Sequence, residues 1–129
     1  GVERQDGAQR SALTVIWFLL TAATLSRWHR VVGADETWHH VAGASLELWL
    51  LPPGGGVAER RLVGQQLARE EGAQAVAVVP ANWWQAARCR GEWSLVSCCV
   101  GPGFEFHDFA LLREQPKETH PPGALEDLL

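Results

Sequence analysis

The stretch SRWHRVVGADETWHHVAG, residues 26–43, decides the fold, because it predicts two strands joined by the turn Gly33-Ala34-Asp35. Successive residues of a strand point to opposite faces, so Glu36, Trp38 and His40 are expected to share one face of the second strand. We therefore expect the Glu36 carboxyl and the His40 ring to face the same space. An acid and several histidines in two short strands make this segment the candidate for a site.

Short strand-like segments continue on both sides of this stretch. They are rich in β-branched and aromatic residues, and they lie at residues 14–21, 25–31, 36–42, 46–51, 73–79, 93–100 and 104–112. Glycine and proline turns separate them, for example PPGGG at 52–56 and GPG at 101–103. Many short strands punctuated in this way predict an all-β sandwich or barrel.

The remaining segments are less regular. Residues 57–71 suit either a short helix or a hairpin, and their glycines favour the hairpin. We expect a polar N-terminal segment at 1–10, one domain at 11–112, and a tail at 113–129 that drapes over the surface and carries no chemistry. The run 14–21 is apolar at successive positions, so it predicts a strand covered on both faces.

Charge and composition exclude several classes of partner. The net charge is -4 and the basic residues are scattered, which leaves no basic stripe for a nucleic acid. The nearly uncharged stretch 11–26 is shorter than the roughly 20 residues of a membrane span. Residues 1–10 are too polar for a secretory leader, so a cytoplasmic protein is expected. The three cysteines, Cys89, Cys98 and Cys99, are expected to be free thiols.

Two motifs carry a resemblance to the cupins. The first cupin motif, G-x5-H-x-H-x3-4-E-x6-G, is matched by His29, Glu36 and Gly43. The second, G-x5-P-x-G-x2-H-x3-N, is echoed from Pro80, with Gln85 in the place of its histidine. The resemblance implies a cupin-type double-stranded β-helix, that is, a jelly-roll sandwich or barrel.

Within the cupins, the chain is similar to one uncharacterised subfamily of the DUF985 type, whose members are regarded as predicted sugar epimerases. The shared sequence motifs are SRWHRV, DE-x-WH, LEL, VVPA-x-x-WQAA and PGFEF-x-DF, and the resemblance covers most of residues 11–112. The glycine-rich PEGGYF stretch usual near the start of that subfamily is absent here. Contacts from that first strand are therefore not expected.

The resemblance also bears on metal binding. Val31 stands where a metal-binding cupin has its second histidine, and Gln85 replaces the last one. Transition-metal sites favour three or four imidazole or carboxylate ligands. A divalent transition metal, if one binds, would have to use His29, Glu36, His40 and Gln85, so no tight intrinsic metal site is expected.

His29 and Glu36 are the predicted catalytic residues, because they occupy the motif positions. A buried Glu36 must pair with His29 or Arg30, bind a cation, or keep a raised pKa as a proton-transfer group. Further residues are predicted to bind the ligand, although the tryptophans among them could instead fill the core: Trp38, His40, Trp84 and Gln85. His39, His107 and His120 are interpreted as structural.

Three functions remain open. The first is a metal-independent isomerase or epimerase acting on a sugar or nucleotide-sugar, with His29 as base and Glu36 as acid or orienting group. The second is a non-catalytic module that holds a small, partly apolar ligand. The third is a metal-dependent oxygenase or lyase. The well-known cupin sugar epimerases use a tyrosine acid, and this chain contains no tyrosine. A homodimer is expected, with the strand at 14–21 at its interface.

Overall fold

A computed structural model describes residues 1–65 and 72–129 of the chain. Over these residues the secondary structure consists of short strands and single 3-10 turns. The elements, in chain order, are β1 (Val2–Glu3), β2 (Gln9–Arg10), β3 (Thr14–Thr21), β4 (Leu25–Val31), β5 (Asp35–Gly43), β6 (Leu46–Leu51), β7 (Glu59–Val63), β8 (Val76–Val79), β9 (Trp84–Cys89), β10 (Trp93–Gly101), η1 (Phe106–Asp108), β11 (Phe109–Leu111), η2 (Leu112–Glu114), η3 (Lys117–Thr119) and η4 (Glu126–Leu128).

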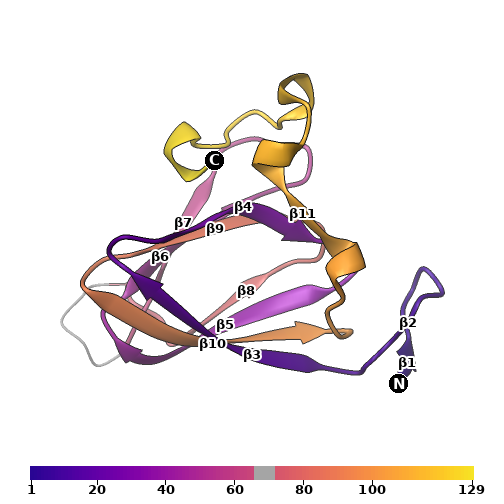
Figure 1. Ribbon diagram of the computed structural model, residues 1–129, viewed down its shortest axis with the longest axis horizontal. Helices are drawn as coiled ribbons and strands as arrows, with labels where there is room; N and C mark the ends of the chain where they lie inside the picture. The colour runs from indigo at the N-terminus through magenta and orange to yellow at the C-terminus, as the bar shows by residue number, and fades with distance from the viewer. Residues whose placement is uncertain (66–71) are drawn as a thin grey trace.

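Two antiparallel sheets face each other and form the predicted all-β sandwich (Figure 1). One sheet has the order β3-β10-β5-β8, and the other has the order β11-β4-β9-β6-β7. Alternate residues of the strands point inward, so the main core lies between the sheets, around Leu20, Leu48, Leu50 and Val96. No helix in the described ranges is long and apolar enough to cross a bilayer.

Most strands lie where the sequence predicts them, but one central strand was missed. The predicted bounds of β3, β4 and β6 agree with the structure. The missed strand, β9, pairs with both β4 and β6 and contains the fully buried Ala86 and Ala87. Alanine has low β-propensity, so its sequence gave no strand signal. The strand predicted at 73–79 begins only at Val76, and the one predicted at 104–112 is reduced to β11, preceded by η1.

The ambiguous segment 57–71 is partly settled. Within it β7 pairs antiparallel with β6, which agrees with the hairpin interpretation and not with a helix. Residues 66–71 of that segment lie outside the described residues.

The polar N-terminal segment forms the small hairpin β1-β2, which an ionic cluster attaches to η1. Asp108 accepts hydrogen bonds from Arg4 at 3.0 Å and from two nitrogens of Arg10 at 3.0 and 3.1 Å. Burial would raise the pKa of Asp108, but the hydrogen bonds from Arg10 and Arg4 lower it below its ordinary value. The cluster thus holds in place the segment that follows Phe104 and precedes β11.

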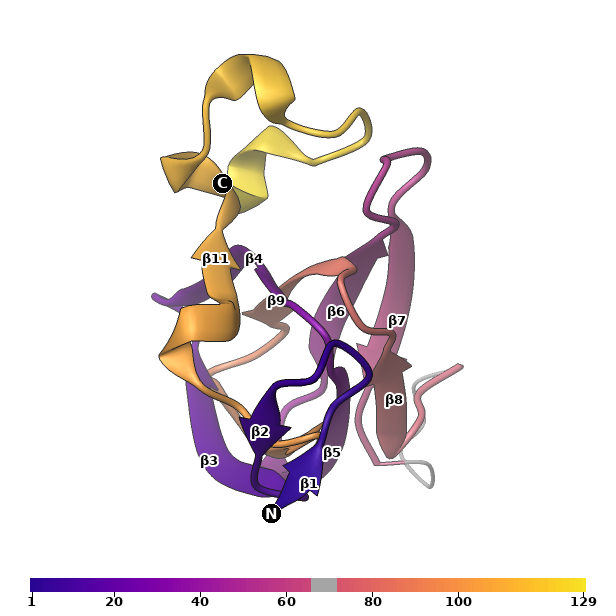
Figure 2. The same cartoon turned by 90° about the vertical axis from the view of Figure 1, so that its right-hand side faces the viewer.

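The C-terminal tail packs against the protein and is not merely draped over it. It covers the outer face of the five-stranded sheet (Figure 2), where a second core forms around Trp28, Trp84 and Leu128. Leu128 is fully buried, and the indole Nε1 of Trp28 donates to the Leu125 carbonyl at 3.0 Å. The prolines of the tail obscured this, because they break any regular pattern.

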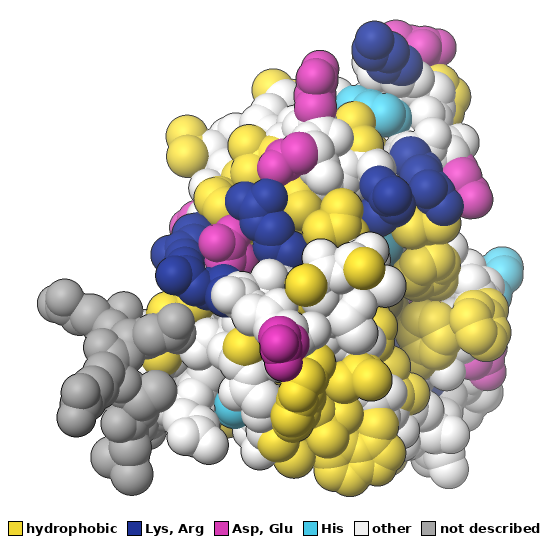
Figure 3. Space-filling model, turned by 60° about the vertical axis from the view of Figure 1, so that its left-hand side comes forward, with side chains coloured by type: hydrophobic (Ala, Val, Ile, Leu, Met, Phe, Trp, Pro, Cys, Tyr) yellow, Lys and Arg dark blue, Asp and Glu magenta, His cyan; other side chains and the backbone are white. Residues whose placement is uncertain are grey.

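The outer face of the four-stranded sheet is not covered by the described residues of this chain. Val15, Trp17 and Leu19 on β3 are 58%, 70% and 55% exposed, so the prediction that this strand is covered on both faces is wrong for the single chain. Hydrophobic side chains gather at the lower edge of Figure 3, the side on which β3 and β10 lie in Figure 1. This apolar outer face is large for a surface exposed to water.

Candidate functional site

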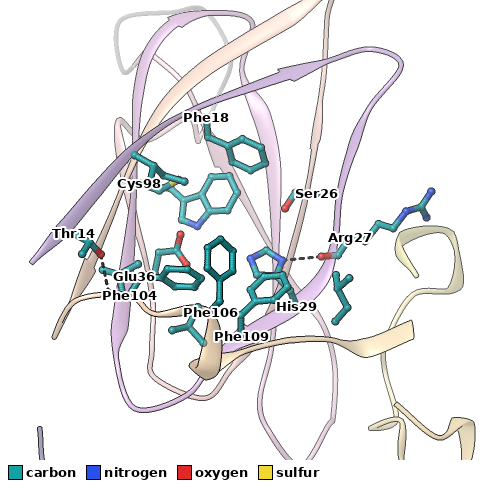
Figure 4. A pocket seen from close by; sticks show the side chains of 15 residues that line it. Thr14, Phe18, Ser26, Arg27, His29, Glu36, Cys98, Phe104, Phe106 and Phe109 are labelled. Carbon is teal, nitrogen blue, oxygen red and sulfur yellow. Dashed lines mark hydrogen bonds between the residues drawn. The ribbon is translucent and has the colours of Figure 1, made fainter. Parts of the chain in front are cut away.

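A cavity of about 540 Å³ lies between the sheets at one end of the sandwich (Figure 4). Its volume is within the range of small-molecule sites, roughly 300–1,000 Å³. Strands β3, β4, β5 and β10 supply its walls, and the segment from Phe104 to Leu111 closes one side. The lining is mostly aliphatic and aromatic, and it consists of Thr14, Ile16, Phe18, Ser26, Arg27, His29, Val31, Glu36, Trp38, Cys98, Val100, Phe104, Phe106, Phe109 and Leu111.

His29 is held in one tautomer. Its Nδ1 lies 2.8 Å from the backbone carbonyl oxygen of Arg27. A carbonyl can only accept, so Nδ1 carries the proton and Nε2 keeps a free lone pair. Burial lowers the pKa of His29 below its ordinary value, against a smaller raising effect of the Arg27 carbonyl. The ring also stacks on Phe109, with centroids 5.5 Å apart. His29 is therefore a neutral, oriented base on the wall of the cavity (Figure 4).

Glu36 enters the same cavity from β5, in the opposite sheet. Burial raises its pKa to about 7, and hydrogen bonds from Gln85 and Cys98 only partly oppose that effect. A buried Glu36 was expected to pair with His29 or Arg30, to bind a cation, or to have a raised pKa, and the raised pKa is what the structure supports. Arg30 cannot neutralise it, because Arg30 follows His29 on β4 and so points to the other face of that sheet. The carboxyl is thus able to gain or lose a proton near neutral pH.

Gln85 fixes the orientation of the Glu36 carboxyl. Its Nε2 donates to Glu36 Oε1 at 2.9 Å, and its Oε1 accepts from the Trp38 indole Nε1 at 2.8 Å. Gln85 faces His29 across the β4-β9 pairing, so both side chains point to the interior. The amide is 1% exposed and lies behind the cavity wall, where it positions Glu36. His29, Glu36 and Trp38 thus lie on the cavity wall with Gln85 behind it, and their roles at a site stay predictions.

Cys98 joins this group from β10. It lines the cavity next to Glu36, whereas Cys99 points to the other face, as strand alternation predicts. Burial, and then the negative charge of Glu36, raises the pKa of the Cys98 thiol, which therefore stays protonated. Cys89, Cys98 and Cys99 are all free, as expected.

His40 does not lie in the cavity, so the expectation that it faces the same space as Glu36 is wrong. A bulge interrupts the β5-β10 pairing, where Leu95 pairs with Ala42 but Val96 pairs with His40. The bulge lies beyond His40, so Glu36, Trp38 and His40 stay in register with Val100, Cys98 and Val96 and share one face of β5. His40 is outside the cavity because it lies farther along that face than Trp38, the last β5 residue of the lining. The His40 Nε2 instead lies 3.2 Å from the carbonyl oxygens of Gly43 and Ala44.

Trp84 also lies outside the cavity. It precedes Gln85 on β9 and therefore points to the outer face of the sheet, where the guanidinium of Arg30 lies 4.7 Å from its ring centroid. The sequence analysis did not identify the aromatic residues Phe104, Phe106 and Phe109 of the cavity rim as site residues. The phenylalanine-rich segment PGFEFHDF, residues 102–109, could have indicated that these rings lie at a site.

The donor set does not fit a transition-metal ion. Within the described ranges, no three His, Cys, Asp or Glu side chains are close enough together to hold one. The aliphatic side chain of Val31 lines the cavity where metal-binding cupins carry a histidine, and the amide of Gln85 is engaged by Trp38 and Glu36. His29, Glu36 and Cys98 line the cavity but do not come close enough together to form the three-ligand group that a tight site needs. The side chains of the cavity are therefore the groups considered for its chemistry.

Comparison with known proteins agrees with the fold. Two solved structures are similar over most of the chain. A protein from Shewanella oneidensis is 35% identical, with a TM-score of 0.72, over 79% of this chain and 63% of its own. A hypothetical protein from Leishmania major is 32% identical, with a TM-score of 0.76, over 84% of this chain and 69% of its own. The chain thus spans less than two thirds of the Shewanella protein. No curated protein matches the chain.

A more distant structure shares the fold alone. It is a dTDP sugar isomerase from Desulfovibrio desulfuricans, 11% identical, with a TM-score of 0.65, over 92% of this chain and 72% of its own. The family model described as Cupin superfamily (DUF985) matches residues 2–112. Both the predicted resemblance and the cupin-type double-stranded β-helix are confirmed. The chain belongs to the DUF985 family of the cupin superfamily, Cupin_5.

Proposed function

We propose that the cavity binds a small, largely apolar molecule with a carbonyl group, and that His29 and Glu36 transfer protons to and from it in an isomerase-type reaction. One observation carries the proposal. A histidine fixed with a free Nε2 and a carboxylic acid with a pKa of about 7 line the same mainly apolar cavity. Titratable groups whose pKa values are shifted by burial and that share a pocket are typical of acid-base catalysis, and here burial raises the pKa of Glu36 and lowers that of His29.

The two groups have complementary tasks. The neutral His29 accepts a proton at Nε2 from the carbon next to the carbonyl, while protonated Glu36 donates its proton to the carbonyl oxygen. The enol that results has the same net charge as the substrate. In an α-hydroxy carbonyl compound this enol is an enediol. Return of the proton from His29 to the former carbonyl carbon, with transfer of the proton of the neighbouring hydroxyl to Glu36, moves the carbonyl to the adjacent carbon and restores both side chains. The Gln85 amide keeps Glu36 directed at the substrate throughout.

The lining favours an uncharged substrate. Among the described residues of the cavity wall, Arg27 is the only Arg or Lys, and its guanidinium points away from the cavity in Figure 4 and donates to the Leu129 carbonyl. A nucleoside diphosphate would therefore meet no cation there to balance its charge. The sugar isomerase from Desulfovibrio is 11% identical, so it lends support to the fold and not to a nucleotide-sugar substrate. A small ketone or an unphosphorylated keto-sugar fits these walls better.

Solvent-deuterium exchange tests the proposal. Candidate ketones and keto-sugars are incubated with the protein in D₂O, and ¹H NMR follows loss of the signal from the carbon next to the carbonyl. The native protein should catalyse exchange in at least one of them, whereas the His29→Gln and Glu36→Gln variants should not. His39→Gln is the matched control, because His39 lies on β5 but bonds to Thr37 outside the cavity. Exchange that survives in His29→Gln would contradict the assigned base.

A non-catalytic binding module is the second candidate, and the apolar lining favours it. Five aromatic side chains, Phe18, Trp38, Phe104, Phe106 and Phe109, line the cavity, and the chain has no tyrosine to serve as an acid. Saturable binding of a ligand, measured by calorimetry, without any exchange of its protons would support this function over catalysis.

We also infer that the chain forms a homodimer through the apolar outer face of the four-stranded sheet. Strand β3 is an edge strand, paired only with β10 among the described strands, and it exposes Val15, Trp17 and Leu19. A second copy placed about a two-fold axis would cover the same face on both chains. Light scattering should give a dimer for the native protein and a monomer for Trp17→Lys. Val57→Lys, at a loop residue 87% exposed, should stay dimeric. A monomeric native protein would overturn the inference.

A further inference from the structure

A second cavity lies on the opposite side of the five-stranded sheet from the first. It has a volume of about 230 Å³, and it lies between strands β4 and β9 and the C-terminal segment that Figures 1 and 2 show above them. The residues that line it are Arg30, Pro53, Trp84, Leu112, Gln115, Pro116, Thr119 and Pro121. The two cavities are back to back, because His29 pairs with Gln85 and the next residue pair, Arg30 and Trp84, points the other way.

Arg30 is the charged group of this second cavity. Its guanidinium lies over the Trp84 indole, 4.7 Å from the ring centroid, and the indole face attracts the cation. Its Nε is buried and has no hydrogen-bond partner, which distinguishes it from every other buried side-chain nitrogen or oxygen in the described part of the chain. Burying an unpaired donor costs free energy, and native proteins rarely leave one without a hydrogen-bond partner. The site therefore lacks an acceptor.

No carboxylate of the described residues fills this role. None of the ion pairs in the described ranges includes Arg30, although Arg4, Arg10, Arg60, Arg61, Arg88 and Arg90 all have one. The nearby Glu114 and Glu118 are exposed and do not line the cavity. A guanidinium with one face covered by an indole still presents its N–H edge, which matches the two oxygens of a carboxylate.

The other residues that line the second cavity determine the size and polarity of the ligand it can hold. Pro53, Leu112, Pro116 and Pro121 are apolar, and the polar groups beside Arg30 are the uncharged Gln115 and Thr119. The volume is below the roughly 300 Å³ at which drug-sized sites begin. We propose that this cavity is a binding site for a small carboxylate with a short apolar body, seated with its oxygens on the guanidinium of Arg30 and its carbon chain against the prolines. This site is independent of the function proposed for the first cavity.

Titration of the ¹⁵N-labelled native protein with butyrate tests the proposal directly. Butyrate should shift the Arg30 Nε–H and Trp84 indole N–H signals in a saturable way, whereas the uncharged butyramide should not. Inorganic phosphate should bind more weakly than butyrate, because the apolar walls contribute nothing to it. The proposal is overturned if butyrate leaves the Arg30 signal unchanged, if it shifts the His29 ring signals instead, or if phosphate binds as tightly as butyrate.

Two variants distinguish butyrate binding at Arg30 from non-specific attraction of anions to the protein. Arg30→Gln should weaken butyrate binding about tenfold or more, the size expected for loss of a hydrogen bond to a charged group. Arg113→Gln makes the same change of charge at an exposed neighbour that does not line the cavity, and it should bind butyrate like the native protein. Equal weakening in both variants would overturn the assignment to Arg30. The native titration stands by itself if Arg30→Gln does not fold.

Discussion

Replacing Trp28 with alanine should lower the free energy of unfolding by about 3–5 kcal/mol, the range for removing a large buried aromatic side chain. Trp28 is completely buried on the outer face of the five-stranded sheet, where it packs in one cluster with Leu112 and Leu128. Its indole also donates to the Leu125 carbonyl at 3.0 Å, so the substitution removes both packing and a hydrogen bond that connect the tail to the domain. The loss should therefore affect more than the local strand.

Urea unfolding monitored by circular dichroism measures this effect. Trp28→Phe serves as the comparison, because it keeps most of the apolar volume but lacks the indole N–H. It should cost much less than the alanine variant, about 1 kcal/mol for the hydrogen bond together with a small packing defect. If Trp28→Ala costs no more than Trp28→Phe, the tail does not contribute to the stability of the domain.

The contribution of sequence to the fold is clearest in strands β3, β4 and β6. Each is a run of β-branched, aromatic or leucine residues bounded by turn residues, and local preference agrees with the final structure. Strand β9 is different, because its sequence WQAARC has no such local preference. Its place between β4 and β6 is determined by tertiary packing, in which small alanines lie fully buried under the neighbouring strands. The residues of β9 and their neighbours in the sequence do not predict this position.

Because strand β9 was not predicted, the neighbouring residues Trp84 and Gln85 were both assigned to ligand binding. Trp84 and Gln85 were both expected to bind ligand, but alternation along β9 sends them to opposite faces of the sheet. His40 does share the face of Glu36, but it lies two residues beyond Trp38 along β5 and outside the cavity, whose extent depends on the tertiary structure and not on the alternation of β5 alone. His29 and Glu36 were found because motif spacing fixes their strands directly. The roles assigned to these residues stay predictions.

Replacing Glu36 with glutamine should stabilise the protein at alkaline pH by up to about 3 kcal/mol and leave its stability near pH 5 almost unchanged. Burial raises the pKa of Glu36 from 4.5 to about 7 in the folded protein. Between these values the folded state holds a proton that the unfolded state has lost, so native stability falls as the pH rises through this window. Glutamine has nearly the same shape, still accepts from Gln85 and never ionises, so it avoids this loss.

Urea unfolding of the native protein and of Glu36→Gln across pH 5 to 8.5 isolates this contribution. The lowered pKa of His29 acts in the opposite direction, because there the unfolded state binds the proton more readily. That contribution is present in both proteins and cancels in their difference. Glu47→Gln is a useful control, since hydrogen bonds from Arg88 and Trp49 lower the pKa of Glu47 despite its burial, and its ionised form is stabilising. A difference between native and Glu36→Gln that does not change with pH would mean that Glu36 does not titrate near neutrality, and it could not then be the proton donor of the proposed reaction.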